Sequence, residues 1–254
     1  MAESRQQTAL VTGSTSGIGR ATASALARAG AFVVVTGRDE ARGKETCEEI
    51  RAAGGQAALV LADLTEPDAV RELVRRATAE AGGQIDILVN NAGDGFYAPT
   101  EQISLETFDA LFAVNTRAPF QLTAALAPAM AQRGHGVIVN VTGTAADLGV
   151  AGLSVFGAAK AALASMTRTW AAEFGPRGVR VNAVDLGAIV TPRAEGAREI
   201  LDGYSALIPA RRAGEADEVA AVIAFLASPA AAYIHGVVLP VDGGMTVTAP
   251  IAVS

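Results

Sequence analysis

Lys160 is a natural starting point for chemistry in this chain, because a buried or paired lysine can hold a ligand and change the acidity of a neighbouring group. It follows Phe156 by four residues, and this spacing puts both side chains on one face of a helix. Phe156 has no hydroxyl and cannot exchange a proton. Asn115 and Asp185, the latter directly after an apolar run, are further polar candidates. An amine, an amide and a carboxyl are groups that bind a ligand and move a proton beside it.

Three glycines follow the first apolar run of the chain. The segment Thr12–Gly19 reads TGSTSGIG and separates the run Thr8–Val11 from a predicted helix at Gly17–Ala29. Glycines at such a turn let the backbone approach a pyrophosphate, and the helix N-terminus offers free N–H groups and a partial positive charge. The G-x-x-x-G-x-G spacing differs from the common G-x-G-x-x-G pattern, and the alternative is a turn that needs glycine for its geometry only.

Short apolar runs alternate with longer amphipathic segments. The predicted strands are Thr8–Val11, Phe32–Thr36, Ala57–Leu61, Ile85–Val89, Val137–Val141, Val179–Val184 and Val237–Val241. The predicted helices are Gly17–Ala29, Glu40–Ala53, Pro67–Ala81, Leu105–Arg133, Val155–Phe174 and Glu215–Ala227. Runs without alternation indicate strands buried on both faces, so the predicted fold class is α/β with a doubly wound parallel sheet. Residues 1–254 contain no linker and are expected to form one domain, with a lid at about 186–214.

The composition of the chain excludes several kinds of partner. Half of the 254 residues are hydrophobic, 18% are charged, and the formal net charge is −6 with no run of Lys or Arg. No nucleic-acid partner is expected, since phosphate backbones need a concentrated positive patch. A single cysteine (Cys47), a polar N-terminus and the lack of an apolar stretch of about 18 residues predict a cytoplasmic protein without a membrane span. His135 and His235 are isolated, so no metal site is expected.

The chain resembles a short-chain dehydrogenase/reductase over nearly its whole length. Thr12–Gly19 is similar to the family's cofactor turn, the NNAG run 90–93 to a motif bordering the cofactor, and Asn115 and Lys160 to two active-site residues. The resemblance implies a single-domain, Rossmann-type sheet of seven parallel strands in the order 3-2-1-4-5-6-7. It also implies a set of cofactor-binding residues: Gly13, Ser14, Thr15, Ser16, Gly17, Ile18, Gly19, Arg38, Asp63, Leu64, Asn90, Ala92, Gly93, Lys160, Gly187, Ile189 and Thr191.

The end of the second predicted strand indicates which nicotinamide cofactor is bound. An acidic residue there usually binds the adenosine ribose of NAD, but this position is Gly37 and is followed by Arg38. A guanidinium can pair with a 2′-phosphate, which an acid would repel, so NADP(H) is predicted. The alternative for Arg38 is a solvated residue opening a helix capped by Asp39. Asp63 resembles the family residue beside the adenine, or else caps the helix that follows.

The resemblance also shows which groups are missing. The family uses a tyrosine to exchange a proton with the substrate carbonyl and a serine to hydrogen-bond that carbonyl. These positions correspond to Phe156 and Gly143, so both hydroxyls are absent. Three explanations are open: an engineered silencing, a natural enzyme with a reassigned acid, or a protein that binds NADP(H) without turnover. The candidates for a reassigned acid are Thr142, Thr144, Asp147, Asp94, Tyr97, Asp185 and Tyr204.

Asp185 departs from the family pattern. The family usually carries Pro-Gly after the sixth strand, whereas Val184–Gly187 reads VDLG. A carboxyl at this position lies near the nicotinamide in the family's geometry, and burial would raise its pKa toward neutrality. The alternative is an exposed carboxylate that caps the loop.

The predicted function is NADP(H)-dependent oxidoreduction of a carbonyl/alcohol pair, of the ketoreductase or alcohol dehydrogenase type, with a non-standard or silenced active site. The alternative is a non-redox NADP(H)-binding protein, or an enzyme that uses the pocket for isomerisation or cyclisation. The expected partner is an apolar small molecule, set by Phe96, Tyr97, Leu148–Leu153 and the lid. Family members usually pair their long helices across subunits, which implies a homotetramer or, failing that, a dimer.

Overall fold

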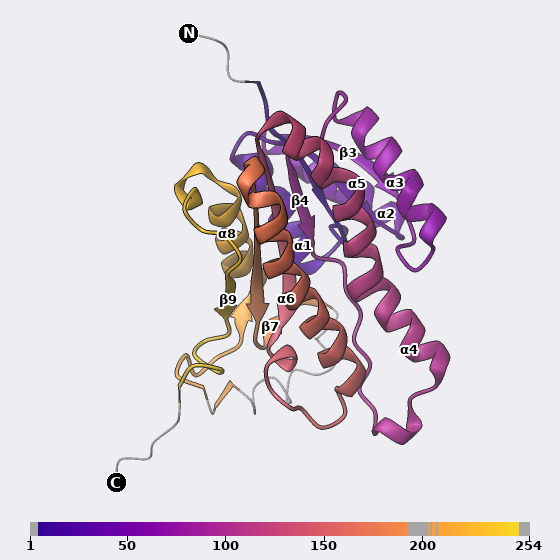
Figure 1. The fold of residues 1–254 in the computed structure, drawn as a ribbon, viewed down its shortest axis with the longest axis vertical. Coiled ribbons are helices and arrows are strands. Elements are labelled where there is room, and N and C mark those ends of the chain that lie inside the picture. Colours follow the sequence, from indigo (N-terminus) through magenta and orange to yellow (C-terminus); the bar gives the residue numbers. More distant parts are fainter. Residues whose placement is uncertain (1–4, 193–202, 204, 207, 249–254) are drawn as a thin grey trace.

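Seven parallel strands form the central sheet, in the order β3-β2-β1-β4-β5-β6-β9 (Figure 1). The computed structural model describes residues 5–192, 203, 205–206 and 208–248. The strands are β1 (Thr8–Val11), β2 (Phe32–Gly37), β3 (Gln56–Leu61), β4 (Ile87–Asn90), β5 (Gly136–Gly143), β6 (Val179–Leu186) and β9 (Val238–Val241). Every residue of β1, β4 and β5 is buried, as expected for apolar runs without alternation. The predicted fold class and strand order are confirmed, with β9 as the seventh strand.

Helices cover both faces of the sheet (Figure 1). The helices α1 (Gly17–Arg28), α2 (Glu40–Ala52) and α8 (Ala216–Ala227) share one core, to which they contribute Leu26, Ile50 and Ile223. The helices α3 (Pro67–Glu80), α5 (Ala118–Arg133) and α6 (Ser154–Phe174) share the other, which contains Leu73, Leu122 and Leu163. The apolar stripe of each helix therefore determines which face of the sheet the helix covers.

The prediction of one long helix at Leu105–Arg133 is wrong in one respect. The structure divides it into α4 (Leu105–Phe112), a π-helical turn η2 (Ala113–Arg117) and α5. A π turn widens one turn of the helix, and such turns are frequent at functional sites. Here the widened turn contains Asn115, whose side chain is fully buried. A single widened turn barely changes the spacing of apolar residues, so the sequence pattern did not predict it.

Because all seven strands are parallel, their carboxyl ends lie along one edge of the sheet. The strand order reverses between β1 and β4, and ligands of such sheets bind beside the carboxyl ends at this point. At this edge β7 (Ile189–Val190) pairs in parallel with β8 (Gly214–Glu215), which joins the two ends of the predicted lid. Most of the predicted lid, together with the candidate acid Tyr204, lies outside the described residues. In the part of the chain that the structure describes, no helix is both long and apolar enough to cross a bilayer.

Candidate active site

The glycine turn after β1 has the shape of an anion-binding loop. Gly13 and Gly17 adopt left-handed conformations, with φ of 65° and 51°, which disfavour any side chain. A Cβ on Gly19 would overlap the carbonyl oxygen of Gly13, so helix α1 begins in direct contact with the turn. Ser16, at the N-cap, makes no side-chain capping bond, and the first turn of α1 has no acid. The N–H groups and the positive end of the helix dipole therefore fit a pyrophosphate.

The NNAG motif after β4 braces this turn. The Thr12 hydroxyl accepts hydrogen bonds from the N–H groups of Asn91 (3.0 Å) and Ala92 (2.9 Å) and donates to the Val89 carbonyl. The Asn91 side-chain amide donates to the Thr12 carbonyl at 2.7 Å. Neither Thr12 nor Asn91 was among the predicted site residues, although both lie in the motifs that were recognised. Their role is to hold the two carboxyl-end loops in a fixed relation.

Two predicted cofactor residues direct their side chains into the protein. Ser14 is fully buried, donates to the Val11 carbonyl at 2.6 Å and accepts from the Thr36 N–H at 2.9 Å. Its backbone N–H also donates to the Thr36 carbonyl at 2.9 Å, so Ser14 serves to fix the turn against β2. The Asn90 amide donates to Asn140 at 2.8 Å, and Asn140 donates in turn to Thr167 on α6. Asn90 therefore belongs to a buried polar chain that ties β4 and β5 to α6.

The adenosine end of the site is formed by the loops after β2 and β3. A Cβ on Gly37 would lie 2.7 Å from the Thr15 methyl, so an acidic side chain at position 37 would require Thr15 to move. Arg38 is exposed beside this turn. Although partial burial opposes it, hydrogen bonds from Thr65 and the charge of Arg38 keep the pKa of Asp63 below its usual value. Leu64 is buried next to it. The end of β2 thus carries a glycine and an exposed arginine and no acid.

Asn115 and Lys160 approach each other at Gly93. A Cβ on Gly93 would lie 2.9 Å from Asn115 Oδ1 and 3.0 Å from Lys160 Nζ. The Asn115 amide donates to the carbonyls of Asp94 (2.8 Å) and Leu111 (2.9 Å), whereas its Oδ1 is buried without a hydrogen-bond partner. The Thr116 hydroxyl donates to the Ala159 carbonyl at 3.0 Å, which fixes the π turn against α6. An unpaired buried carbonyl oxygen is suited to a bound water that continues toward Lys160.

Lys160 is nearly fully buried, and its ammonium donates to the Val141 carbonyl at 2.9 Å. Burial, only partly offset by the charge of Asp185, lowers its pKa to about 8. The amine can therefore change its charge close to neutral pH, which is useful for a group in a proton path. It is the strongest titratable candidate among the residues that the resemblance implied.

Phe156 and Gly143 lie side by side. The Gly143 backbone is extended (φ −165°), and a Cβ there would lie 3.7 Å from Phe156 Cε1 and 3.8 Å from Cζ. A Cβ on Gly95 would lie 3.8 Å from the opposite edge of the same ring. The Phe156 ring is half-buried, and Lys160 Nζ lies 5.7 Å from its centroid. The two positions that lack a hydroxyl are thus neighbours, and a serine side chain fits at position 143.

Comparisons with known proteins agree with this arrangement. A solved structure described as a short-chain dehydrogenase/reductase family protein is 48% identical, with a TM-score of 0.85, and the match covers 94% of this chain and 96% of that one. A family model described as enoyl-(acyl carrier protein) reductase matches residues 13–246. The chain belongs to the short-chain dehydrogenase/reductase family. The recognition made from the motifs is therefore confirmed at the level of the family.

Two further relatives show how different the members of this family are. The 3-oxoacyl-[acyl-carrier-protein] reductase of Synechocystis sp. is 41% identical over 243 residues, which cover 94% of this chain and 96% of that protein. A solved structure of a putative NAD(P)-dependent gluconate 5-dehydrogenase from Beutenbergia cavernae, with bound NADP at low occupancy, is 38% identical with a TM-score of 0.91 and covers 95% of this chain and 97% of that one. Both names describe oxidoreductases, and the substrates that they name are unlike each other.

The segment after β6 contains three predicted cofactor residues and lies against the glycine turn. A Cβ on Gly187 would lie 2.7 Å from the Asp242 Cα, so only glycine allows β6 to end this close to the end of β9. Thr191 lies next to Gly17, because a Cβ on that glycine would contact the Thr191 side chain at 3.4 Å. Ile189, in β7, packs on the α1 and α8 side of the core. The segment 187–191 and the glycine turn therefore face each other.

Asp185 is buried, and the expectation of an exposed carboxylate capping the loop is wrong. Only 1% of its surface is exposed, and the Thr142 hydroxyl contacts its Oδ1 at 2.6 Å. Its other oxygen has no hydrogen-bond partner. Burial, together with the charges of Asp147 and Asp242, raises the pKa of Asp185 despite the contact with Thr142 and the charge of Lys160. Register with Thr142 on β5 and Pro240 on β9 encloses the side chain.

The other candidate acids are less well placed for proton transfer. Asp147 is exposed at the end of the turn η3 (Thr144–Ala146). Tyr97 is 73% exposed and its ring packs against Gly152. The Thr144 hydroxyl contacts the Met245 sulfur at 3.9 Å, which brings the segment after β9 next to the turn η3. Met245 was not predicted, since no motif marks a residue that reaches the site from the end of the fold.

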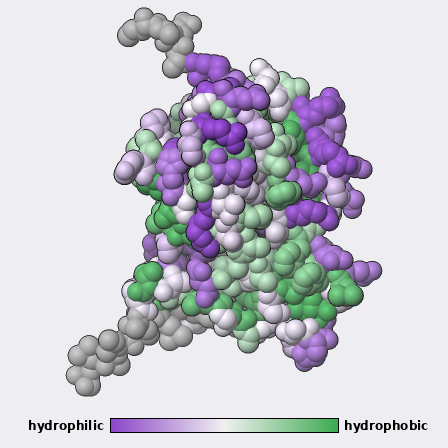
Figure 2. Space-filling view, in the orientation of Figure 1, coloured by the Kyte–Doolittle hydropathy of each residue, from purple (hydrophilic) through white to green (hydrophobic). Residues whose placement is uncertain are grey.

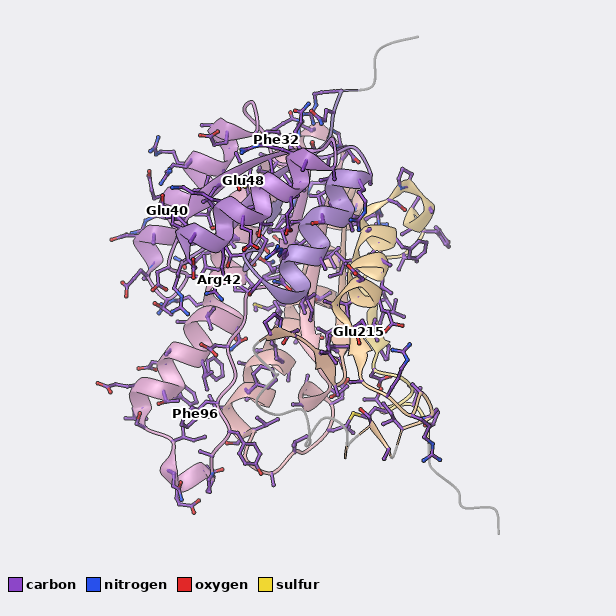
Figure 3. The ribbon with its side chains drawn as sticks, turned by 180° about the vertical axis from the view of Figure 1, so that it is seen from behind. Phe32, Glu40, Arg42, Glu48, Phe96 and Glu215 are labelled. Carbon is purple, nitrogen blue, oxygen red and sulfur yellow. The ribbon has the colours of Figure 1, made fainter. Side chains whose placement is uncertain are left out.

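Phe96 shows where the carboxyl ends of the strands lie in the molecule. Figure 3 places Phe96 at the end of the molecule remote from Phe32, the first residue of β2. Phe32 marks the amino ends of the strands, so Phe96 stands beyond their carboxyl ends, and it is 44% exposed. Glu40, Arg42 and Glu48 lie on α2, which begins just after Arg38 (Figure 3). Among the described residues no group of three His, Cys, Asp or Glu side chains could hold a metal ion.

Proposed function

We propose that this protein is an NADP(H)-dependent oxidoreductase that interconverts a carbonyl and a CH–OH group, with an active site that lacks the usual tyrosine and serine. The observation that carries the proposal is the approach of Lys160 and Asn115 at Gly93, beside an uncapped glycine turn. The bound cofactor would supply or accept a hydride. The chain's own residues bind it, exclude water and hold the proton.

NADP(H) is favoured over NAD(H) by three neighbouring residues. Gly37 leaves no acid at the end of β2, Thr15 fills the space in which such an acid would stand, and Arg38 is exposed beside them. A guanidinium in this place can form charge-assisted hydrogen bonds to a 2′-phosphate. The NADP named for the Beutenbergia cavernae relative supports the same choice.

Lys160 and Asn115 would keep the roles that the family gives them. The Lys160 ammonium, held by the Val141 carbonyl, would hold the ribose near the reacting atoms. The unpaired Oδ1 of Asn115 would hold a water that leads to this ammonium. Phe156 would form an apolar wall, and Gly143 would leave only backbone where the family has its carbonyl-binding hydroxyl.

A small apolar carbonyl compound is the proposed substrate. Phe96 and Tyr97 are exposed at the carboxyl edge of the sheet, and the Met245 sulfur contacts the Thr144 hydroxyl. The ring of Phe156 between Gly143 and Gly95 adds a flat apolar surface. We infer that the segment 186–214, in one domain with the rest of the chain, closes over this substrate.

A second function is favoured by the same two positions that make the site unusual. Without a hydroxyl at 156 or 143, the pocket has neither of the family's groups for a carbonyl oxygen. A protein that binds NADP(H) without turnover, or one that carries out an isomerisation or cyclisation, would have no need of them.

Assembly into a homotetramer, or a dimer, is proposed from the surface of α4 and α5. Leu105, Phe108 and Phe120 are exposed there, and Phe108 stacks on Phe112 with ring centroids 4.7 Å apart. Figure 2 shows hydrophobic residues gathered over the lower right of the molecule, where Figure 1 places α4. Exposed apolar patches of this kind are typical of subunit contacts. A cytoplasmic location is proposed on the single buried cysteine, Cys47.

The first test is titration of the protein with NADPH and NADH, followed by a carbonyl turnover screen. NADPH is expected to bind more tightly, and Arg38→Ala should remove most of this preference. The same screen is run on the double variant G143S/F156Y, which restores both hydroxyls, and its serine fits because the new Cβ lies 3.7 Å from the Phe156 ring atom Cε1. Restoring acid catalysis should raise turnover by about 10²–10⁴-fold if no other acid acts. Failure of both forms to bind NADPH would refute the proposal, and binding without turnover in both would favour the second function.

A further inference from the structure

Two glycines border the Phe156 ring, one at each of two opposite edges. A Cβ on Gly95 would lie 3.8 Å from the ring atom Cδ2, and a Cβ on Gly143 would lie 3.7 Å from Cε1. Neither glycine has a side chain that could donate a hydrogen bond, and the Gly95 N–H already donates to the Asp94 carboxylate at 3.0 Å. The ring and the two side-chain positions beside it thus offer only carbon to a substrate.

Thr144 and Lys160 do not take the place of the missing hydroxyls. The backbone of Gly143 is extended, so the next side chain points to the opposite face, where the Thr144 hydroxyl contacts the Met245 sulfur. The Lys160 ammonium donates to the Val141 carbonyl at 2.9 Å and lies 5.7 Å from the centroid of the ring. This separation exceeds the hydrogen-bond distance of about 2.7–3.2 Å.

A site of this kind is poorly suited to a carbonyl oxygen. Hydride transfer to a ketone produces two charges from none, an alkoxide and an oxidised nicotinamide cation, and separating charges in an apolar site costs free energy. A proton from a tyrosine removes the alkoxide. Hydride transfer to an iminium ion creates no new charge, because the single positive charge passes from the substrate to the nicotinamide. The product is a neutral amine, which requires no proton.

The loops after β4 and β5, which are neighbouring strands, carry groups that attract an organic cation. Asp94 lies on the first loop, and Asp147 is exposed on the second, at the end of the turn η3. The rings of Phe96 and Tyr97 are exposed on the first loop. Carboxylates and aromatic faces both attract organic cations. The charge of Lys160 opposes them, but burial lowers its pKa to about 8, so this charge is readily lost.

We propose that this site reduces the C=N bond of an iminium ion, a substrate that carries its positive charge before the hydride arrives. The inference goes beyond carbonyl reduction and rests on the proposed function for the bound NADPH. The step balances: the hydride forms a C–H bond at the iminium carbon, the C=N π electrons become the lone pair of nitrogen, and NADPH is oxidised to NADP⁺. No proton leaves the protein, which agrees with Phe156 and Gly143.

The first test compares two compounds of similar size in turnover with NADPH: an N-methyl dihydroisoquinolinium salt, whose charge is permanent, and the ketone tetralone. Rates are corrected for the reaction without protein. The ketone alone needs an acid, so kcat/KM for the salt should be larger by about 10²–10⁴-fold. Equal values for the two compounds, or faster reduction of tetralone, would overturn the proposal.

The pH dependence shows whether the protein supplies a proton. Turnover of unmethylated dihydroisoquinoline should fall as the pH rises through the pKa of the imine itself, since only its protonated form accepts hydride. The N-methyl salt should lack this limb. Ionisation of Lys160 affects both compounds and cancels in their ratio. A limb of the same size with the permanently charged salt would show that an acid of the protein acts, and the proposal would fail.

Restoring the hydroxyls should affect the two reactions differently. In G143S/F156Y, kcat/KM for tetralone should rise by about 10²–10⁴-fold, while the value for the salt should change by less than about tenfold. The matched control is Phe225→Tyr, which adds a phenol on the last turn of α8, where Arg180 from the start of β6 contacts the helix end. It should leave both rates unchanged. An equal gain with both compounds in G143S/F156Y would contradict the proposal.

Binding to the apoprotein, measured by calorimetry, gives a readout that needs no turnover. The N-methyl salt should bind more tightly than tetralone. Asp147→Asn should weaken binding of the salt by about twofold to fivefold and leave that of the ketone unchanged. Asp68→Asn, which removes an exposed carboxylate on α3, is the control and should change neither. Tighter binding of the neutral ketone than of the salt would overturn the preference for a cation.

The outcomes separate this inference from the proposed function. If the parent protein reduces tetralone as well as the salt, the proposed function stands and the iminium preference is refuted. The same holds if the parent reduces neither compound and G143S/F156Y reduces tetralone. If NADPH does not bind, the proposed function fails and the reduction step fails with it. The calorimetric comparison of salt and ketone would still decide whether the site prefers a cation.

Discussion

Asp86 and Asp185 are both 1% exposed, yet they lie at opposite edges of the same sheet and in opposite environments. Asp86 directly precedes β4 and accepts hydrogen bonds from the Thr8 N–H and hydroxyl and from the side chains of Arg5 and Gln84. Arg133 and His135 approach it at 3.9 and 3.8 Å. Among the described residues, Asp185 has one hydrogen bond, with Thr142, and one oxygen without a hydrogen-bond partner.

The two environments have opposite effects on acidity. Burial alone would raise the pKa of Asp86, but the hydrogen bonds from Thr8 and Arg5 outweigh it and hold the pKa below its usual value. At Asp185 burial dominates and the pKa is raised. The amino edge of the sheet thus uses its carboxylate to tie β1, β4 and the loop before β5 together. The carboxyl edge holds an acid at a cost in stability, which is typical of a functional group.

Of the substitutions that separate Asp86 from Asp185, Asp86→Ala is expected to change the free energy of unfolding most. The substitution leaves Thr8, Gln84 and Arg5 without their acceptor, and removing one partner of a buried ionic network typically costs about 3–5 kcal/mol. Urea unfolding at pH 7 measures this loss. Asp68→Ala, at an exposed position on α3, is the control and should have little effect. A loss at Asp86 no larger than at Asp68 would mean that the network at the amino edge is not a stabilising one.

A smaller change in the free energy of unfolding, of opposite sign, is expected from Asp185→Asn. The amide keeps the shape of the side chain and the contact with Thr142, and it removes a group that resists ionisation in its buried place. The free energy of unfolding at pH 7 should therefore stay the same or rise, by up to about 1 kcal/mol. The matched variant at the other edge, Asp86→Asn, should lower it. Destabilisation by both substitutions would show that the two edges do not differ in kind.

The fold and most of the site could be predicted from the sequence, since local patterns carry them. Buried apolar runs fix the strands, and the TGSTSGIG and NNAG motifs mark the loops after β1 and β4. Lys160 and Asn115 were found because their flanking residues resemble a family. Such features depend on a few neighbouring residues and need no knowledge of distant packing.

The rest depends on contacts between distant segments. Asp86 draws its partners from Arg5, Thr8 and Arg133, and no spacing in the sequence connects them. The burial of Asp185 follows from its register with β5 and β9, which the sequence alone leaves open between a capped loop and an enclosed acid. The π turn at Asn115 likewise depends on the contact of Thr116 with α6. Long-range contacts of this kind become visible only in the folded chain.

The smallest effect is the pH dependence of the same two carboxyls, and here the signs are opposite. The raised pKa of Asp185 means that, between its unfolded value of 3.8 and its folded value, the native state binds more protons than the unfolded state. Its contribution to stability is full below 3.8 and is lost as the pH rises through the folded pKa. The lowered pKa of Asp86 gives stability that is full above 3.8 and is lost as the pH falls through the folded pKa.

Unfolding free energies measured from pH 3 to 8 test this contrast. The stability of Asp185→Asn relative to the parent protein should increase as the pH rises and become constant above the folded pKa of Asp185, with a slope of at most about 1.4 kcal/mol per pH unit. The stability of Asp86→Asn relative to the parent should fall as the pH rises through the acid range, since the parent alone gains from ionisation there. Parallel curves for the two variants would mean that Asp185 ionises as readily as Asp86. The contrast between the two edges of the sheet would then have no thermodynamic basis.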